Sequence, residues 1–152
     1  MPAVVVDTHS ITWYLAKNPA LSKAAEAALD RASAEGHPIY VPSICLVELT
    51  YLVEKGRLPA SARQILIRAL DDPNGPYALA ALDRRVSEAL ESVARSEVPD
   101  LPDRIVAATA VALQGPAGES RQKDSRFRGE YNLVATMPSL RILMAPPLPT
   151  NL

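Results

Sequence analysis

The chain opens with a short, wholly apolar run that ends at an acid. Residues 3–6 read Ala-Val-Val-Val, and Asp7 follows directly. A valine-rich run without polar alternation is typical of a strand that is covered on both faces, as in a parallel sheet between layers of helices. In such sheets, ligands and catalytic groups gather beyond the carboxyl ends of the strands. We therefore expect a parallel α/β fold, with Asp7 as a candidate site residue.

Short apolar segments alternate with helical ones along the rest of the chain, which is the pattern of parallel α/β folds. We expect further strands at residues 38–41, 77–82 and 140–144, and helices at residues 11–17, 21–35, 43–55, 60–71, 84–95 and 103–113. In the helix that carries Glu48, Ser43 is the expected N-cap and Gly56 the expected terminator. Helical spacing places Glu48 on one face with Ile44, Tyr51 and Leu52, which we interpret as core-facing.

The size and composition of the chain favour a single globular domain. We expect this domain at residues 1–145, followed by a proline-rich tail at residues 146–152. Lys and Arg number 16 and Asp and Glu 17, for a net charge of −1, so any site for a polyanion must be local. The lone Cys45 is expected to be a buried, reduced thiol, and no apolar run approaches the ~20 residues that span a bilayer. We expect a cytoplasmic protein without membrane segments.

Four acids from four separate segments form the best clue to chemistry: Asp7, Glu48, Asp103 and Asp124. If they converged, their charges would repel and their pKa values would rise unless a cation were bound. Carboxylate oxygens suit Mg²⁺ or Mn²⁺, and such a centre suits hydrolysis of a phosphodiester.

Each acid also has a purely structural alternative, and spacing alone leaves the choice open. Asp7 could be a loop residue or an N-cap before Thr8-His9-Ser10, and Asp103 could cap a helix that begins at Arg104. Glu48 could pair with an arginine, and Asp124 could simply be solvated.

Three stretches resemble the motifs of PIN-domain ribonucleases and, among these, of VapC-type toxins from toxin-antitoxin pairs. They are residues 4–15, residues 42–49 with their continuation at 53–58, and residues 100–110, which match best. The resemblance implies a three-layer α/β/α fold with a short, mainly parallel sheet, and an endoribonuclease that depends on Mg²⁺ or Mn²⁺. It also implies that Asp7, Glu48 and Asp103 bind the metal, with Asp100 as an auxiliary. The implied partners are RNA, a second copy of the chain, and a cognate antitoxin that enters the acidic groove and offers an arginine to the carboxylates.

The fourth motif departs from the family pattern. Asp124 still aligns, but Ser120 and Arg121 replace apolar residues and Gln122 replaces a hydroxyl residue. One alternative is therefore a catalytically weakened PIN-like protein that binds RNA or an antitoxin. The other is a metal-dependent phosphatase on an unrelated α/β fold.

Basic and aromatic side chains are the candidates for contacts with RNA. Arg121, Lys123 and Arg126 flank Asp124, and Arg104 follows Asp103, so these four are predicted to hold phosphates. Bases could stack on Trp13, Tyr14, Tyr51 or Phe127, although packing in the core or an interface is the favoured interpretation of these aromatic residues.

Overall fold

The computed structural model describes residues 4–114, and its centre is a small parallel sheet. The strands are β1 (Val4–Val5), β2 (Ile39–Pro42) and β3 (Tyr77–Ala80), in the order β1-β2-β3. Val4 lies opposite Ile39 on β2, and Ile39 lies opposite Tyr77 on β3. The parallel pairing predicted from the valine-rich run is confirmed.

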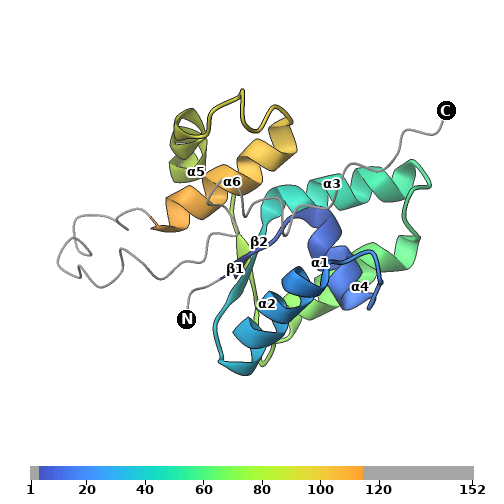
Figure 1. Cartoon of the computed structure of the whole chain (residues 1–152). Coiled ribbons are helices and arrows are strands. Elements are labelled where there is room, and N and C mark those ends of the chain that lie inside the picture. The colour runs from blue at the N-terminus through green and yellow to red at the C-terminus, as the bar shows by residue number, and fades with distance from the viewer. Residues whose placement is uncertain (1–3, 115–152) are drawn as a thin grey trace.

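Helices cover both faces of this sheet. They are α1 (Thr8–Leu15), α2 (Lys23–Ala34), α3 (Ser43–Glu54), α4 (Ala60–Asp71), α5 (Arg84–Ala89) and α6 (Leu101–Gln114), with a 3₁₀ turn, η1 (Leu90–Ser92), after α5. Figure 1 shows α5 and α6 on one side of the strands and α1 to α4 on the other. This arrangement confirms the three-layer α/β/α fold.

Local capping chemistry explains where several helices begin and end. The side chains of Asp7, Ser22 and Asp83 each accept a hydrogen bond from a main-chain N–H in the first turn of α1, α2 and α5. Gly36 and Gly56 follow the ends of α2 and α3 with φ of 72° and 68°, a region that glycine enters without steric cost. The predicted role of Gly56 is confirmed.

Two hydrophobic clusters hold the layers together, and α6 belongs to both. The larger one surrounds the sheet and includes Ile11, Leu29, Ile39, Leu49 and Leu66, with Val106 and Ala110 from α6. The smaller one packs α5 and η1 on α6 through Val86, Val93, Val98, Ala107 and Ala108. Helix α6 therefore separates the sheet core from a second, peripheral core.

Some sequence predictions about local structure were wrong. Ser43 does not cap α3, because Pro42 occupies the N-cap position and Ser43 Oγ instead accepts a hydrogen bond from Leu82 N at 2.9 Å. Tyr51 does not face the core, because 54% of it is exposed. The helix predicted at residues 84–95 is shorter, since α5 ends at Ala89 and η1 follows.

Other predictions fall on residues that the structure does not describe. The strand at 140–144, the boundary at 145 and the tail lie outside residues 4–114. Within the described part, no helix is long and apolar enough to cross a membrane.

Candidate metal-dependent active site

Asp7 lies where β1 leads into α1, and it is 6% exposed. Its Oδ1 accepts a hydrogen bond from Ser10 N at 2.8 Å, so the alternative role as a helix cap is confirmed. That role does not exclude another, because an ionised carboxylate has about four acceptor positions. The cap fixes the carboxylate at the carboxyl end of a buried strand, where α/β proteins place their ligands.

Glu48 approaches Asp7 from α3 and is oriented by a threonine. Thr8 Oγ1 donates a hydrogen bond to Glu48 Oε1 at 2.7 Å. Burial raises the pKa of Glu48, as do Asp100 and Asp7, while the Thr8 hydrogen bond and His9 lower it. Within residues 4–114 no arginine pairs with Glu48, so the ion-pair alternative is wrong for this part of the chain.

Asp100 and Asp103 stand at the start of α6, and the helix is capped by Asp100 instead of Asp103. Asp100 is the capping residue: its Oδ2 accepts from Asp103 N at 3.3 Å, and its main-chain oxygen accepts from Arg104 N at 2.9 Å. Because α6 begins at Leu101, Asp103 lies in the first turn and does not cap the helix. Burial raises the pKa of Asp103 to about 7, with further contributions from Asp100, Asp7 and Glu48.

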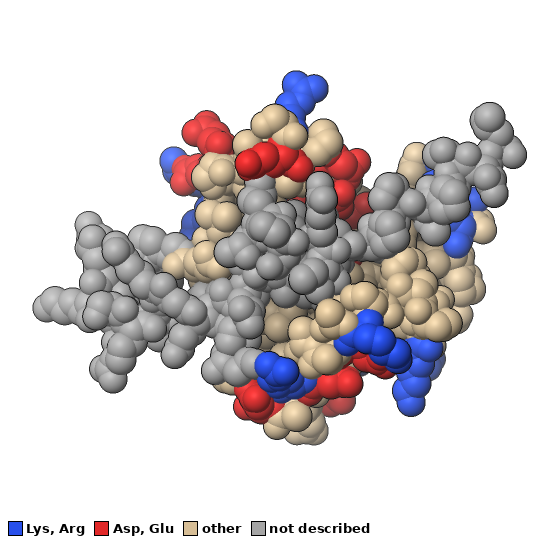
Figure 2. Space-filling view, in the orientation of Figure 1, with Lys and Arg blue, Asp and Glu red and all other residues tan. Residues whose placement is uncertain are grey.

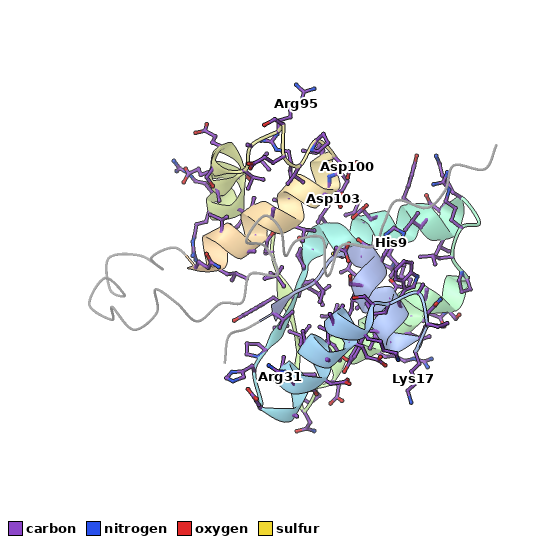
Figure 3. All side chains as sticks on the ribbon, viewed as in Figure 1. His9, Lys17, Arg31, Arg95, Asp100 and Asp103 are labelled. Carbon is purple, nitrogen blue, oxygen red and sulfur yellow. The ribbon has the colours of Figure 1, made fainter. Side chains whose placement is uncertain are left out.

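Four carboxylates lie in the same region of the molecule, near enough for three of them to raise the pKa of the fourth. Asp7, Glu48 and Asp100 all act on Asp103, although they come from three different segments. Figure 3 shows Asp100 and Asp103 at one end of α6, with His9 opposite them on α1. In Figure 2, acidic side chains gather over the region where α5 and the start of α6 lie.

Neighbouring side chains define the surroundings of the carboxylates. Burial lowers the pKa of His9, against the opposing effect of Glu48, and its ring centroid lies 5.7 Å from that of Trp13. Cys45 is fully buried, with its Sγ 3.7 Å from Val6 O, and burial raises its pKa to about 12. The predicted buried thiol is confirmed, and a thiol with so high a pKa is a poor nucleophile.

The donor set suits a hard divalent cation. Asp7 and Asp100 help burial to raise the pKa values of Glu48 and Asp103, and a nearby positive charge would relieve this repulsion. Carboxylate oxygens are also the ligands that Mg²⁺ prefers. Among residues 4–114, however, no three His, Cys, Asp or Glu side chains are grouped to hold one ion together. Mg²⁺ commonly takes only one or two protein carboxylates and completes its shell with water and substrate phosphate, so the described residues fit such a water-rich site.

Arg104, predicted to contact RNA, has an evident structural role. Its Nη2 donates to Leu90 O at 3.1 Å and to Val93 O at 2.9 Å, which fastens η1 to α6. A contact with RNA stays a prediction for Arg104. Asp124, Arg121, Lys123 and Arg126 lie outside the described residues.

Thr8 and His9 were not among the site residues that the sequence predicted, although Thr8 bonds to Glu48 and His9 lies close enough for Glu48 to affect its pKa. Both follow Asp7 on the first turn of α1, so their proximity to any site at Asp7 was readable from the chain. The sequence pattern did not indicate that Thr8 bonds to Glu48, which lies 40 residues further along the chain.

The fold and the site together define a small α/β protein with a carboxylate cluster beyond the carboxyl end of its parallel sheet. A comparison with protein families agrees, matching the PIN domain over residues 4–126. The chain therefore belongs to the PIN domain family, whose members are generally metal-dependent nucleases. No match was found among curated proteins or solved structures.

Proposed function

We propose that the chain is an endoribonuclease that depends on Mg²⁺ or Mn²⁺ and acts in the cytoplasm as the toxin of a toxin-antitoxin pair. The observation that carries this proposal is the proximity of Asp7, Glu48, Asp100 and Asp103 in a PIN domain, where burial and then the three neighbouring acids raise the pKa of Asp103 to about 7. Buried carboxylates that lie near one another are costly to ionise without a counter-charge, so such a group is well suited to bind a cation.

Each described acid has a distinct means of being held in place. Asp7 is fixed by its bond to Ser10 N, Glu48 by the Thr8 hydroxyl, and Asp103 by the first turn of α6. With Asp124, these residues would hold the ion, and Asp100 would add negative charge beside them. When bound, the ion would activate water for attack on phosphorus and offset the negative charge of the phosphate.

The proposed partners follow from the same charge distribution. The chain as a whole carries a net charge of −1 and offers RNA no general attraction. Local cations would therefore hold the RNA phosphates, and we assign this role to Arg104, Arg121, Lys123 and Arg126. The proposed antitoxin would offer an arginine to the carboxylates, where it would replace the cation. A homodimer is part of the same proposal.

A second candidate is a PIN domain that binds RNA or an antitoxin without efficient cleavage. Two observations favour this second candidate. Within residues 4–114 no three side chains are grouped to bind one metal ion, and Gln122 stands where the family usually has a hydroxyl residue. A phosphatase on an unrelated fold is no longer an alternative, because the family match covers both the fold and the site segments.

The test is cleavage of mixed cellular RNA by the purified chain with Mg²⁺ or Mn²⁺, with EDTA and the Asp7→Asn variant as controls. We expect cleavage that requires metal and is lost in the variant. Asparagine caps helices as well as aspartate does, so this variant should stay folded. No cleavage by a folded wild-type chain with either metal would favour the binding protein.

A further inference from the structure

One side of α3 joins the carboxylate site to an exposed aromatic residue and a cation. Glu48 and Tyr51 are three residues apart on α3, and Lys55, the C-cap residue of the helix, follows four residues after Tyr51. This spacing places the three side chains along one stripe. With a rise of 1.5 Å per residue, Lys55 lies ~10 Å along the axis from Glu48, with Tyr51 between them. The stripe thus leads away from the carboxylates over a distance comparable to one or two nucleotides.

Tyr51 is open to solvent although its size and apolar ring favour burial. It is 54% exposed, and Val47, one turn before it, is 63% exposed. Exposed large apolar side chains that lie together indicate a surface for binding. Tyr51 therefore belongs to the surface beside the site and is not part of the core.

Lys55 lies over the Tyr51 ring. Its Nζ is 4.5 Å from the ring centroid, within the distance of a cation–π contact. Lys55 pairs with no carboxylate of residues 4–114, so its charge is available to an anion from outside this part of the chain. A second cation lies on the flank of α3, where Arg63 Nε donates to Thr50 Oγ1 at 3.0 Å.

An aromatic ring with a cation beside it has the chemistry that unpaired nucleotides require. The ring offers a surface on which a base can stack, and the ammonium can contact the adjoining phosphate. A base in a duplex is already stacked and cannot use such a ring, so the pair favours unpaired RNA. We propose that Tyr51 and Lys55 form a subsite for an unpaired nucleotide next to the carboxylates. The inference rests on the proposed function, because it takes the phosphodiester at the carboxylates as its point of reference.

The test is the affinity of the Asp7→Asn protein for a fluorescent unpaired oligoribonucleotide and for the same strand in a duplex, with Mg²⁺ present. Adding Tyr51→Ala should weaken binding of the unpaired strand by about 5- to 100-fold and leave duplex binding within about twofold. Tyr51→Phe keeps the ring and should restore binding.

The salt dependence separates the two roles. Lys55→Met should reduce the slope of log affinity against log salt by about 0.7, the value for one phosphate contact on a single strand, while Tyr51→Ala leaves the slope unchanged. Lys23→Met is the matched control, because Lys23 is an exposed lysine of α2 that pairs with Glu26.

Each outcome decides the inference independently of the nuclease. If the wild-type chain does not cleave RNA but binding depends on Tyr51, the subsite stands and the proposed catalysis fails. If Tyr51→Ala binds RNA normally, the subsite is wrong. Conversion of a dimer into a monomer by Tyr51→Ala, with RNA affinity unchanged, would show instead that this face of α3 contacts a second copy.

Discussion

Thr8 Oγ1 donates a hydrogen bond to Glu48 Oε1 at 2.7 Å and so ties the start of α1 to the middle of α3. Thr8 is 1% exposed and directly follows Asp7. One buried hydroxyl therefore sets the position of one acid relative to another, although 40 residues separate the bonded pair in the chain.

Replacing Thr8 with valine keeps the shape of the side chain and removes the donor. We expect the pKa of Glu48 to rise further, since the Thr8 hydrogen bond lowers it, and the acid limb of the pH–rate profile to move to higher pH. Stability above this pKa should fall by about 1–2 kcal/mol, as for loss of a bond to a partly exposed charge. Thr8→Ser, which keeps the hydroxyl, should behave like the wild type, and an unchanged profile for Thr8→Val would contradict this role.

Two substitutions at Asp7 separate its role as a cap from its role in the site. Asp7→Ala should lower the free energy of unfolding by ~1 kcal/mol, because Ser10 N loses its acceptor, whereas Asp7→Asn should retain most of that stability. Both should lose metal-dependent cleavage. Thermal unfolding and cleavage assays on the same samples check this, and equal stability of the two variants would argue against the cap.

The sequence predicted those parts of the fold that depend on local signals. The valine-rich run before Asp7 predicted a buried parallel strand, and Gly56 predicted the end of α3, because each feature is decided by a few neighbouring residues. Periodicity fixed which residues share a stripe of α3, but not which stripe turns toward the core. Tyr51 was misplaced for that reason.

The site was harder to predict because its contacts join distant segments. Asp100 and Asp103 lie on either side of Leu101 and Pro102, and the local pattern could not decide which of the two acids caps α6. Ser43 has a side chain suited to capping, yet it bonds to Leu82 N, which the fold brings from 39 residues away. The couplings among Asp7, Glu48, Asp100 and Asp103 depend on the same tertiary packing.

The raised pKa of Asp103 predicts a pH-dependent stability without metal. Its value of about 7 in the folded chain exceeds the ordinary 3.8, so the folded state binds the proton more tightly. Protonation of Asp103 therefore adds to the free energy of unfolding in full below pH ~4, and this contribution is lost as the pH rises through ~7.

The Asp103→Asn variant cannot ionise and should be more stable than the wild type at pH 8 in EDTA. Because solvent reaches this carboxyl, we expect a difference of only about 1 kcal/mol, or about 2–4 °C in Tm. The difference should shrink at pH 5 and reverse when Mg²⁺ stabilises the wild type. A Tm difference that is independent of pH would show that Asp103 ionises normally.

Substitutions at Arg104 distinguish a structural role of this side chain from a role in binding RNA. Arg104→Met removes the bonds to Leu90 O and Val93 O, so we expect a loss of about 1–3 kcal/mol in unfolding free energy. Arg104→Lys, with a single ammonium, should recover part of it. Chemical denaturation and salt-dependent RNA binding together decide: unchanged stability with a salt slope reduced by about 0.7 would assign Arg104 to phosphate instead.

The small side chains of α6 determine how closely the two cores approach. Residues 106–110 are all buried, and three of these five are alanines. Ala110 faces the sheet core, while Ala107 and Ala108 face the peripheral one. A close-packed interior tolerates added volume poorly, so a bulkier residue at Ala108 would push the layers apart and carry Asp103 away from Asp7 and Glu48. The distances between Asp103 and the other acids thus depend on alanine side chains that lie more than one helical turn away from Asp103.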